Sequence, residues 1–158
     1  MRLRALVSAG VVVALGAAVV AQAGVMEDRK KSQAYLEAAA KEEGAVKTSS
    51  GLIYKTLTPG TGETPKATDT VRVHYRGTFI DGTEFDSSYK RNEPTEFPVN
   101  KVIKCWTEGL ERMKVGEKAQ LVCPAGIAYG DKGMGGVVPP GAVLVFQVEL
   151  LEIGRAHV

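Results

Sequence analysis

Short runs of alternating apolar and polar residues fill most of the chain after residue 48, and turn signals separate them. The clearest run is TVRVHYRGTFI at residues 70–80, where Val71, Val73 and Tyr75 alternate with polar residues, His74 among them. Successive side chains of a strand point to opposite faces, so the first three are expected in the core and His74 toward water. The Asp-Gly pair at 81–82 predicts a hairpin turn.

Three further runs predict strands: LIYKTLT at 52–58, KAQLVCP at 118–124 and AVLVFQVELLEI at 142–153. Trp106, Leu110 and Met113 recur at helical spacing and predict one short helix over residues 105–113. The stretch at 125–141, AGIAYGDKGMGGVVPPG, holds too much Gly and Pro for regular structure. Loops of that length in compact domains are usually functional. The pattern predicts a small α+β domain with antiparallel strands.

A helix is also expected before this domain. Residues 27–43, EDRKKSQAYLEAAAKEE, contain no Gly or Pro and end at Gly44. Their apolar face is thin, and it consists of Tyr35, Leu36, Ala39 and Ala40. The helix therefore packs on the domain or on a second subunit, or it is a solvated tether.

The first residues are typical of a secretory signal peptide, with a basic start, an apolar run from Ala5 to Val20 and a small-x-small site that predicts cleavage after Ala23. An uncleaved membrane anchor is the alternative, because no charge interrupts residues 5–26. Cleavage would remove Arg2 and Arg4 from a chain with 20 basic and 18 acidic residues, leaving a net charge near zero. Such a balance does not indicate binding to nucleic acid or to a membrane surface.

Export changes the interpretation of the two cysteines. In an oxidising compartment Cys105 and Cys123 are candidates for a disulfide, worth about 3 kcal/mol for so short a loop. Two buried free thiols are the alternative. The cysteines are too far apart for a CxxC redox motif and too few for a zinc site.

Motifs for several common chemistries are absent from the sequence. The loop GDKGMGG matches neither GxGxxG nor GxxxxGK[ST], and there is no GxSxG or HExxH motif. The only histidines are His74 and His157, which gives poor support to triad hydrolysis or zinc catalysis. No cofactor and no metal are expected. Six aromatic residues are spread over distant elements, and their spacing alone indicates packing in a core: Tyr75, Phe85, Phe97, Trp106, Tyr129 and Phe146.

Over residues 50–153 the sequence resembles the FKBP-type peptidyl-prolyl cis-trans isomerases. The resemblance rests on four segments in the same order and at similar separations: VHYRGTFIDGTEFDSS, VIKCWTEGLERMKVGEKA, AYGDKG and VVPPGAVLVFQVELLEI. The N-terminal arrangement is similar to exported bacterial members related to macrophage infectivity potentiator proteins, with a shorter helical part. The resemblance implies an antiparallel sheet of about five strands curled around one short helix, preceded by a short N-terminal helix.

The resemblance also implies a ligand pocket between the helix and the sheet. Trp106 would form its floor, and Tyr129, Asp86 and the Ile103 backbone N–H would supply polar contacts. The other residues implied as catalytic are Tyr75, Phe85 and Phe146, and those implied as substrate-binding are Phe97, Val102, Met134 and Val138. Asp86 could instead cap local backbone groups. Thr95 and Met134 differ from the residues that many family members carry there, and Cys105 replaces a usual Gly, which fits the disulfide to Cys123.

The implied function is an isomerase that accelerates X-Pro bond rotation in proteins folding in the cell envelope, by desolvation in the aromatic pocket. X-Pro segments of exported proteins would be its clients and rapamycin-type macrolides its inhibitors. The alternative is a non-catalytic peptide-binding or holdase chaperone module. The expected organisation is a signal peptide at 1–23, a helical extension or linker at 24–49, the isomerase domain at 50–154 and a tail at 155–158. A periplasmic or secreted monomer, or a weak homodimer through the N-terminal helix, is expected.

Overall fold

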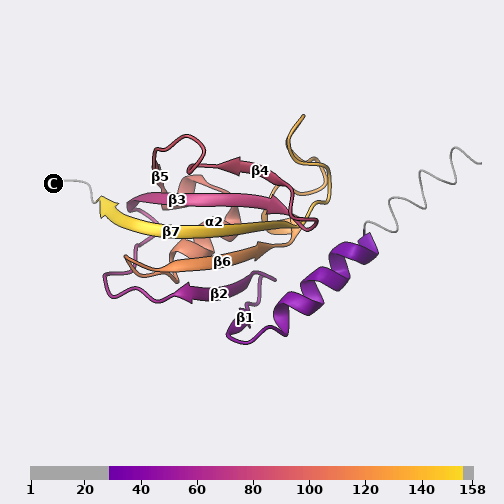
Figure 1. Cartoon of the computed structure of the whole chain (residues 1–158), viewed down its shortest axis with the longest axis horizontal. Coiled ribbons are helices and arrows are strands. Elements are labelled where there is room, and N and C mark those ends of the chain that lie inside the picture. Colours follow the sequence, from indigo (N-terminus) through magenta and orange to yellow (C-terminus); the bar gives the residue numbers. More distant parts are fainter. Residues whose placement is uncertain (1–28, 155–158) are drawn as a thin grey trace, which may run out of the picture. The chain divides into compact units, whose positions relative to one another are not determined.

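The structure, a computed structural model, describes residues 29–154, which form an antiparallel sheet with the short helix α2 beside it (Figure 1). The predicted signal peptide and tail lie outside these residues. The sheet order is β1-β2-β6-β7-β3-β4, and β5 also pairs with β3. The elements are β1 (Ala45–Lys47), β2 (Ile53–Thr58), β3 (Thr70–Phe79), β4 (Glu84–Ser87), β5 (Thr95–Pro98), η1 (Val99–Lys101), α2 (Lys104–Leu110), β6 (Lys118–Cys123), η2 (Ala125–Ile127) and β7 (Leu144–Gly154).

The α+β class is confirmed, but the sheet has seven strands where the family resemblance implies about five. The main reason lies at one edge of β3, whose residues 76–78 pair with β4 and whose residues 70–73 pair with β5. Two short strands therefore share one edge. At the other edge, three residues of β1 pair with β2. The predicted hairpin turn between β3 and β4 is present, because the Phe79 N–H donates to the Thr83 carbonyl at 2.9 Å.

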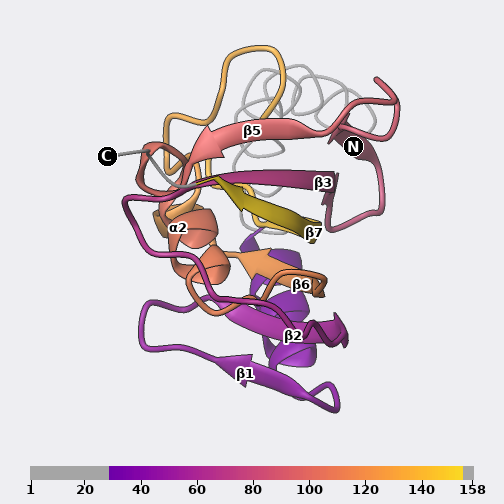
Figure 2. The ribbon, with the colours of Figure 1, turned by 90° about the vertical axis from the view of Figure 1, so that its left-hand side faces the viewer.

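Side-chain alternation divides the interior into two clusters on opposite faces of the sheet. On β7, Leu144 and Phe146 belong to the cluster that includes Trp106 of α2, whereas Val145 belongs to the other. Figure 2 shows α2 lying on one side of the strands. The helix is shorter than the predicted 105–113. A turn follows it, in which the Met113 N–H donates to the Leu110 carbonyl at 3.1 Å. The Met113 side chain is nevertheless fully buried.

The second cluster includes apolar side chains of the helical residues before β1. Residues 29–40 are helical, and the apolar side chains of Tyr35, Leu36, Ala39 and Ala40 pack against Val122, Val145 and their neighbours on the sheet. Residues 35–40 are therefore packed on the domain and are not a solvated tether. Within residues 29–154, no helix is both long and apolar enough to cross a membrane.

Candidate functional site

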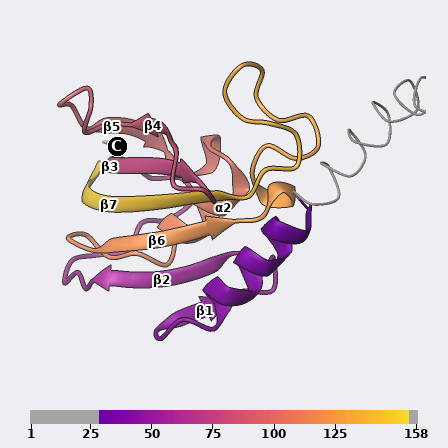
Figure 3. The same ribbon diagram turned by 45° about the vertical axis from the view of Figure 1, so that its right-hand side comes forward.

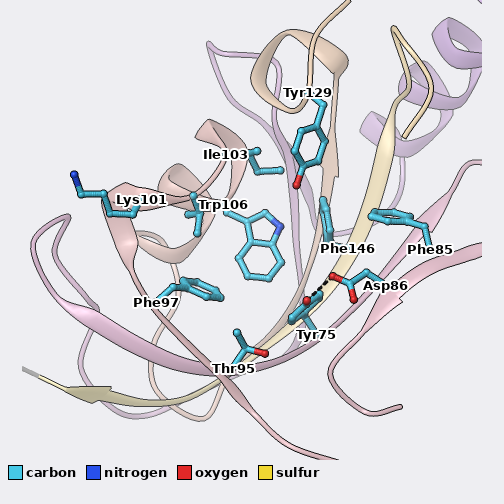
Figure 4. A pocket seen from close by; sticks show the side chains of 11 residues that line it. Tyr75, Phe85, Asp86, Thr95, Phe97, Lys101, Ile103, Trp106, Tyr129 and Phe146 are labelled. Carbon is cyan, nitrogen blue, oxygen red and sulfur yellow. Dashed lines mark hydrogen bonds between the residues drawn. The ribbon is translucent and has the colours of Figure 1, made fainter. Parts of the chain in front are cut away.

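A cavity of about 510 Å³, open to the surface, is lined by side chains from β3, β4, β5, η1, α2, β7 and the loop after η2. Such a volume lies within the range of small-molecule and peptide side-chain sites. Strand pairing brings these distant segments together, because β3 contacts β4, β5 and β7 directly. The lining residues are Tyr75, Phe85, Asp86, Thr95, Phe97, Lys101, Val102, Ile103, Trp106, Tyr129 and Phe146 (Figure 4).

Nine of the eleven predicted site residues line this cavity, but Met134 and Val138 do not. The loop after η2 pairs with itself, since Met134 and Val138 exchange two backbone hydrogen bonds of 2.8 Å. Val138 is buried in the core and Met134 is 40% exposed. Gly133 is required there, because its φ is +67° and an added Cβ would lie 2.3 Å from the Val138 carbonyl oxygen. Figure 3 shows the loop projecting from the sheet.

Trp106 forms the floor of the cavity and is only 5% exposed. Its ring lies 5.0 Å from Tyr75 and 5.2 Å from Phe146, both nearly perpendicular to it, and 5.2 Å from the tilted ring of Phe97. Edge-to-face contacts at such distances stabilise aromatic pairs beyond their buried area. Three strands thus hold one indole in place.

The indole N–H of Trp106 is buried and has no hydrogen-bond acceptor among the described residues. Figure 4 shows its nitrogen on the edge of the ring turned toward Phe146. The Phe146 ring lies perpendicular to the indole at a centroid distance of 5.2 Å.

Phe85 closes another wall, and Gly77 makes room for it. The Phe85 ring is 4.9 Å from Phe79 and 5.7 Å from Phe146. A Cβ on Gly77 would lie 2.7 Å from Phe85 and 2.9 Å from Phe146. A glycine within a strand often marks such close approach, so the glycine in HYRGTF was a sequence signal for the pocket wall.

Asp86 is the centre of a polar cluster on the same side of the cavity as Phe85 (Figure 4). It accepts hydrogen bonds from the Tyr75 hydroxyl and from Arg91, whose Nη1 lies 2.9 Å from Asp86 Oδ1. The same guanidinium donates to the Tyr75 hydroxyl at 3.0 Å and to Thr95 Oγ1 at 3.4 Å. Asp86 also accepts the Ser87 backbone N–H, so the capping interpretation is correct in part.

These contacts fix the charge of the cluster. Burial alone would raise the pKa of Asp86, but the hydrogen bonds from Tyr75 and Arg91 outweigh it, and the pKa lies below its ordinary value. Burial, together with the hydrogen bond to Asp86, raises the pKa of the Tyr75 hydroxyl. At neutral pH the site therefore holds an ionised carboxylate and a protonated phenol.

Replacing Arg91 with glutamine is expected to raise the pKa of Asp86 toward its ordinary value, because the charged donor is lost. In the native protein the Asp86 contribution to stability is present above the ordinary carboxyl pKa and is lost as the pH falls through the lower folded value. Titration of the Asp86 carboxyl carbon by NMR measures this shift. Lys90→Gln is the control, since Lys90 pairs with Glu84; an unchanged titration in Arg91→Gln would contradict the assignment.

Two donors at the cavity have no acceptor among the described residues: the Tyr129 hydroxyl and the Ile103 backbone N–H. Ile103 precedes the first residue of α2, so its N–H is not part of the helix ladder. Burial, then the charge of Asp86, raises the pKa of Tyr129, which keeps the hydroxyl protonated. Figure 4 shows this hydroxyl directed into the cavity. Both groups are free to donate to a bound carbonyl.

The predicted disulfide is present, and it joins Cys105 in α2 to Cys123 at the end of β6 with a Cα–Cα distance of 5.8 Å. Both cysteines are fully buried. Because Trp106 follows Cys105 directly, the bond fixes the turn of helix that carries the cavity floor. The alternative of two free thiols is wrong for this structure.

Arg91 and Lys101 are cavity neighbours that the sequence analysis missed. Arg91 lies in the connection between β4 and β5, whose path no periodic pattern specifies.

His74 is half-buried rather than open to water, since Tyr89 stacks on it at 4.7 Å and Ser88 Oγ lies 2.8 Å from its Nδ1. Among residues 29–154, no group of three potential metal ligands occurs.

Comparisons with known proteins agree with this geometry. The sequence model described as FKBP-type peptidyl-prolyl cis-trans isomerase matches residues 61–151. The chain is 53% identical over 130 residues to the FKBP-type peptidyl-prolyl cis-trans isomerase FkpA of Aeromonas hydrophila, covering 82% of this chain and 48% of the relative. It is 55% identical over 119 residues to the FKBP-type 22 kDa peptidyl-prolyl cis-trans isomerase of Escherichia coli K12, covering 75% and 58%.

Among solved structures, the crystal structure of FkpA from Escherichia coli matches with a TM-score of 0.81 and 43% identity, over 98% of this chain and 72% of that one. A peptidyl-prolyl cis-trans isomerase from Pseudomonas syringae matches with a TM-score of 0.75 and 35% identity, over 80% of this chain and 92% of that one. The chain spans about half the length of the curated relatives it matches. On the matched residues and the fold, the chain belongs to the FKBP-type peptidyl-prolyl cis-trans isomerase family.

Proposed function

We propose that this protein is a peptidyl-prolyl cis-trans isomerase whose reaction takes place in the cavity above Trp106. The observation that carries the proposal is the cavity itself, an apolar space with aromatic walls and two free donors at its edge. Nine of the residues that the family resemblance implies line this cavity, which supports the roles proposed for them.

The reaction is rotation about an amide C–N bond, with a barrier of about 18–20 kcal/mol from the partial double bond. The planar amide is the more charge-separated form and is better solvated by water. The twisted transition state has lost resonance, so it loses less solvation free energy than the planar amide when water is removed. An apolar cavity therefore disfavours the ground state more than the transition state.

Two groups of residues have different roles in this reaction. Trp106, Phe97 and Phe146 exclude water from the prolyl ring, since Phe97 and Phe146 each pack against the indole at the floor. The Tyr129 hydroxyl and the Ile103 N–H hold substrate carbonyls. Each tenfold of acceleration requires only about 1.4 kcal/mol of differential stabilisation, so desolvation and two oriented donors suffice.

The protein is expected to accelerate cis-trans exchange of short Leu-Pro and Phe-Pro peptides, because the cavity would desolvate the prolyl bond. Exchange is measured by a coupled protease assay, with and without a rapamycin-type macrolide. A macrolide that fills the same cavity should abolish the acceleration. Binding of the peptide without acceleration would favour a holdase module and would reject the enzyme.

The place of action proposed for this chain is the bacterial cell envelope, with X-Pro segments of exported proteins as clients. The disulfide supports it, because such bonds persist in oxidising compartments. A relative from Legionella longbeachae, 42% identical, is named outer membrane protein MIP. The predicted cleavage after Ala23 is tested by the mass of the mature protein, and the choice between monomer and weak homodimer by gel filtration of residues 24–158.

A further inference from the structure

Of the described residues, two charged side chains line the cavity, Asp86 and Lys101, and one of the two has a partner among them. Asp86 is paired with Arg91 at 2.9 Å, so its charge is compensated within the protein. Lys101 forms no ion pair or side-chain hydrogen bond with any residue from 29 to 154. Figure 4 shows the two residues on opposite sides of Trp106. The cavity therefore has an uncompensated positive charge on the Lys101 side.

The position of Lys101 determines what this charge can meet. Lys101 is the last residue of η1, two positions before Ile103, whose N–H is free. Its side chain is exposed, and Figure 4 shows Nζ directed away from the indole. The aliphatic stem thus borders the cavity while the ammonium remains at the surface. The charge would meet a residue beside the proline, not the prolyl ring.

Neighbouring acids do not neutralise Lys101. Thr95 and Phe97 of β5 line the cavity, so Glu96 between them points to the other face of the strand, beside Arg72 on β3. Glu108 of α2 accepts from Ser50 and lies 4.0 Å from Arg112. An acid that pairs with Lys101 must therefore come from the substrate.

We propose that Lys101 makes the enzyme prefer prolyl segments that carry an acidic side chain next to the X-Pro pair. This inference rests on the proposed function and names the substrate class of the same site. An exposed ion pair of this kind is worth about two- to fivefold in an equilibrium or in kcat/KM. The preference should fade in high salt, because the screening length falls from about 10 Å at 0.1 M to about 3 Å at 1 M.

The test measures exchange by NMR without a protease, so that peptide charge affects the isomerase alone. Matched acetylated peptides carry Glu, Gln or Lys either immediately before or immediately after the same X-Pro pair. The wild type should show a kcat/KM ratio of Glu to Gln peptide of about two to five at one of these positions. Lys101→Gln should bring that ratio to about one, and Lys101→Glu should favour the Lys peptide.

Lys104→Gln is the matched control, because Lys104 is an exposed lysine three residues away that does not line the cavity. It should keep the wild-type ratio. A ratio of one at both positions in the wild type, or equal loss in Lys104→Gln, would overturn the role of Lys101 while leaving the isomerase intact. Failure of every peptide, including the Gln peptides, to be accelerated would instead reject the proposed function.

Discussion

Replacing Phe146 with alanine is expected to lower kcat/KM for an X-Pro peptide by at least about tenfold, which corresponds to about 1.4 kcal/mol of lost transition-state stabilisation. Phe146 is 4% exposed and contacts both Trp106 and Phe85. Its removal opens the cavity wall to water. NMR exchange or the coupled assay measures the effect.

The same substitution should destabilise the fold by about 3–5 kcal/mol, since it truncates a buried ring. Leu150→Ala separates the two effects. Leu150 is fully buried on the same face of β7, does not line the cavity, and should lose about 2–5 kcal/mol of stability. Per folded molecule, Leu150→Ala should keep its activity. Phe146→Leu keeps most of the volume and serves where the alanine variant does not fold.

Other substitutions in the cavity should lower kcat/KM according to how much of the wall they remove. Trp106→Ala removes the floor and should be at least as damaging as Phe146→Ala. Tyr129→Phe removes one donor and keeps the ring, so its loss should be smaller. Full turnover in a folded Phe146→Ala protein would refute the assignment of catalysis to this cavity.

Alternation along the strands made much of the fold predictable. Val71, Val73 and Tyr75 are buried as predicted, because a one-residue slip of β3 would turn all three toward water. The short edge strands were harder to predict. β4 and β5 contain four residues each, too few for alternation to stand out, so the sequence predicts fewer strands than the sheet contains.

The site was predictable only where the family resemblance supplied it. Spacing alone placed Trp106 and Phe146 in a core, which is also true, since both are buried. Arg91 and Lys101 gave no signal, because their roles depend on how two connections fold beside the cavity. Met134 was expected in the pocket, but the loop closes on itself through Val138 and leaves Met134 exposed.

Reduction of the Cys105–Cys123 bond is expected to lower the free energy of unfolding by about 3 kcal/mol, because the bond closes a loop with a sequence separation of 18. In urea the unfolding midpoint should fall by about 1–3 M. The double variant Cys105→Ala with Cys123→Ala should match the reduced protein. Alanine is preferred to serine, since both positions are fully buried and a hydroxyl there would lack a partner.

Stability and catalysis should respond differently to this change. Trp106 keeps its contacts with Tyr75, Phe97 and Phe146 when the bond is absent, so the folded reduced protein at 25 °C should lose less than about threefold in kcat/KM. Dithiothreitol should have no further effect on the double alanine variant, which controls for effects of the reductant itself. Thiols that titrate in the native oxidised protein, or equal midpoints with and without the bond, would show that α2 is held to β6 by packing alone.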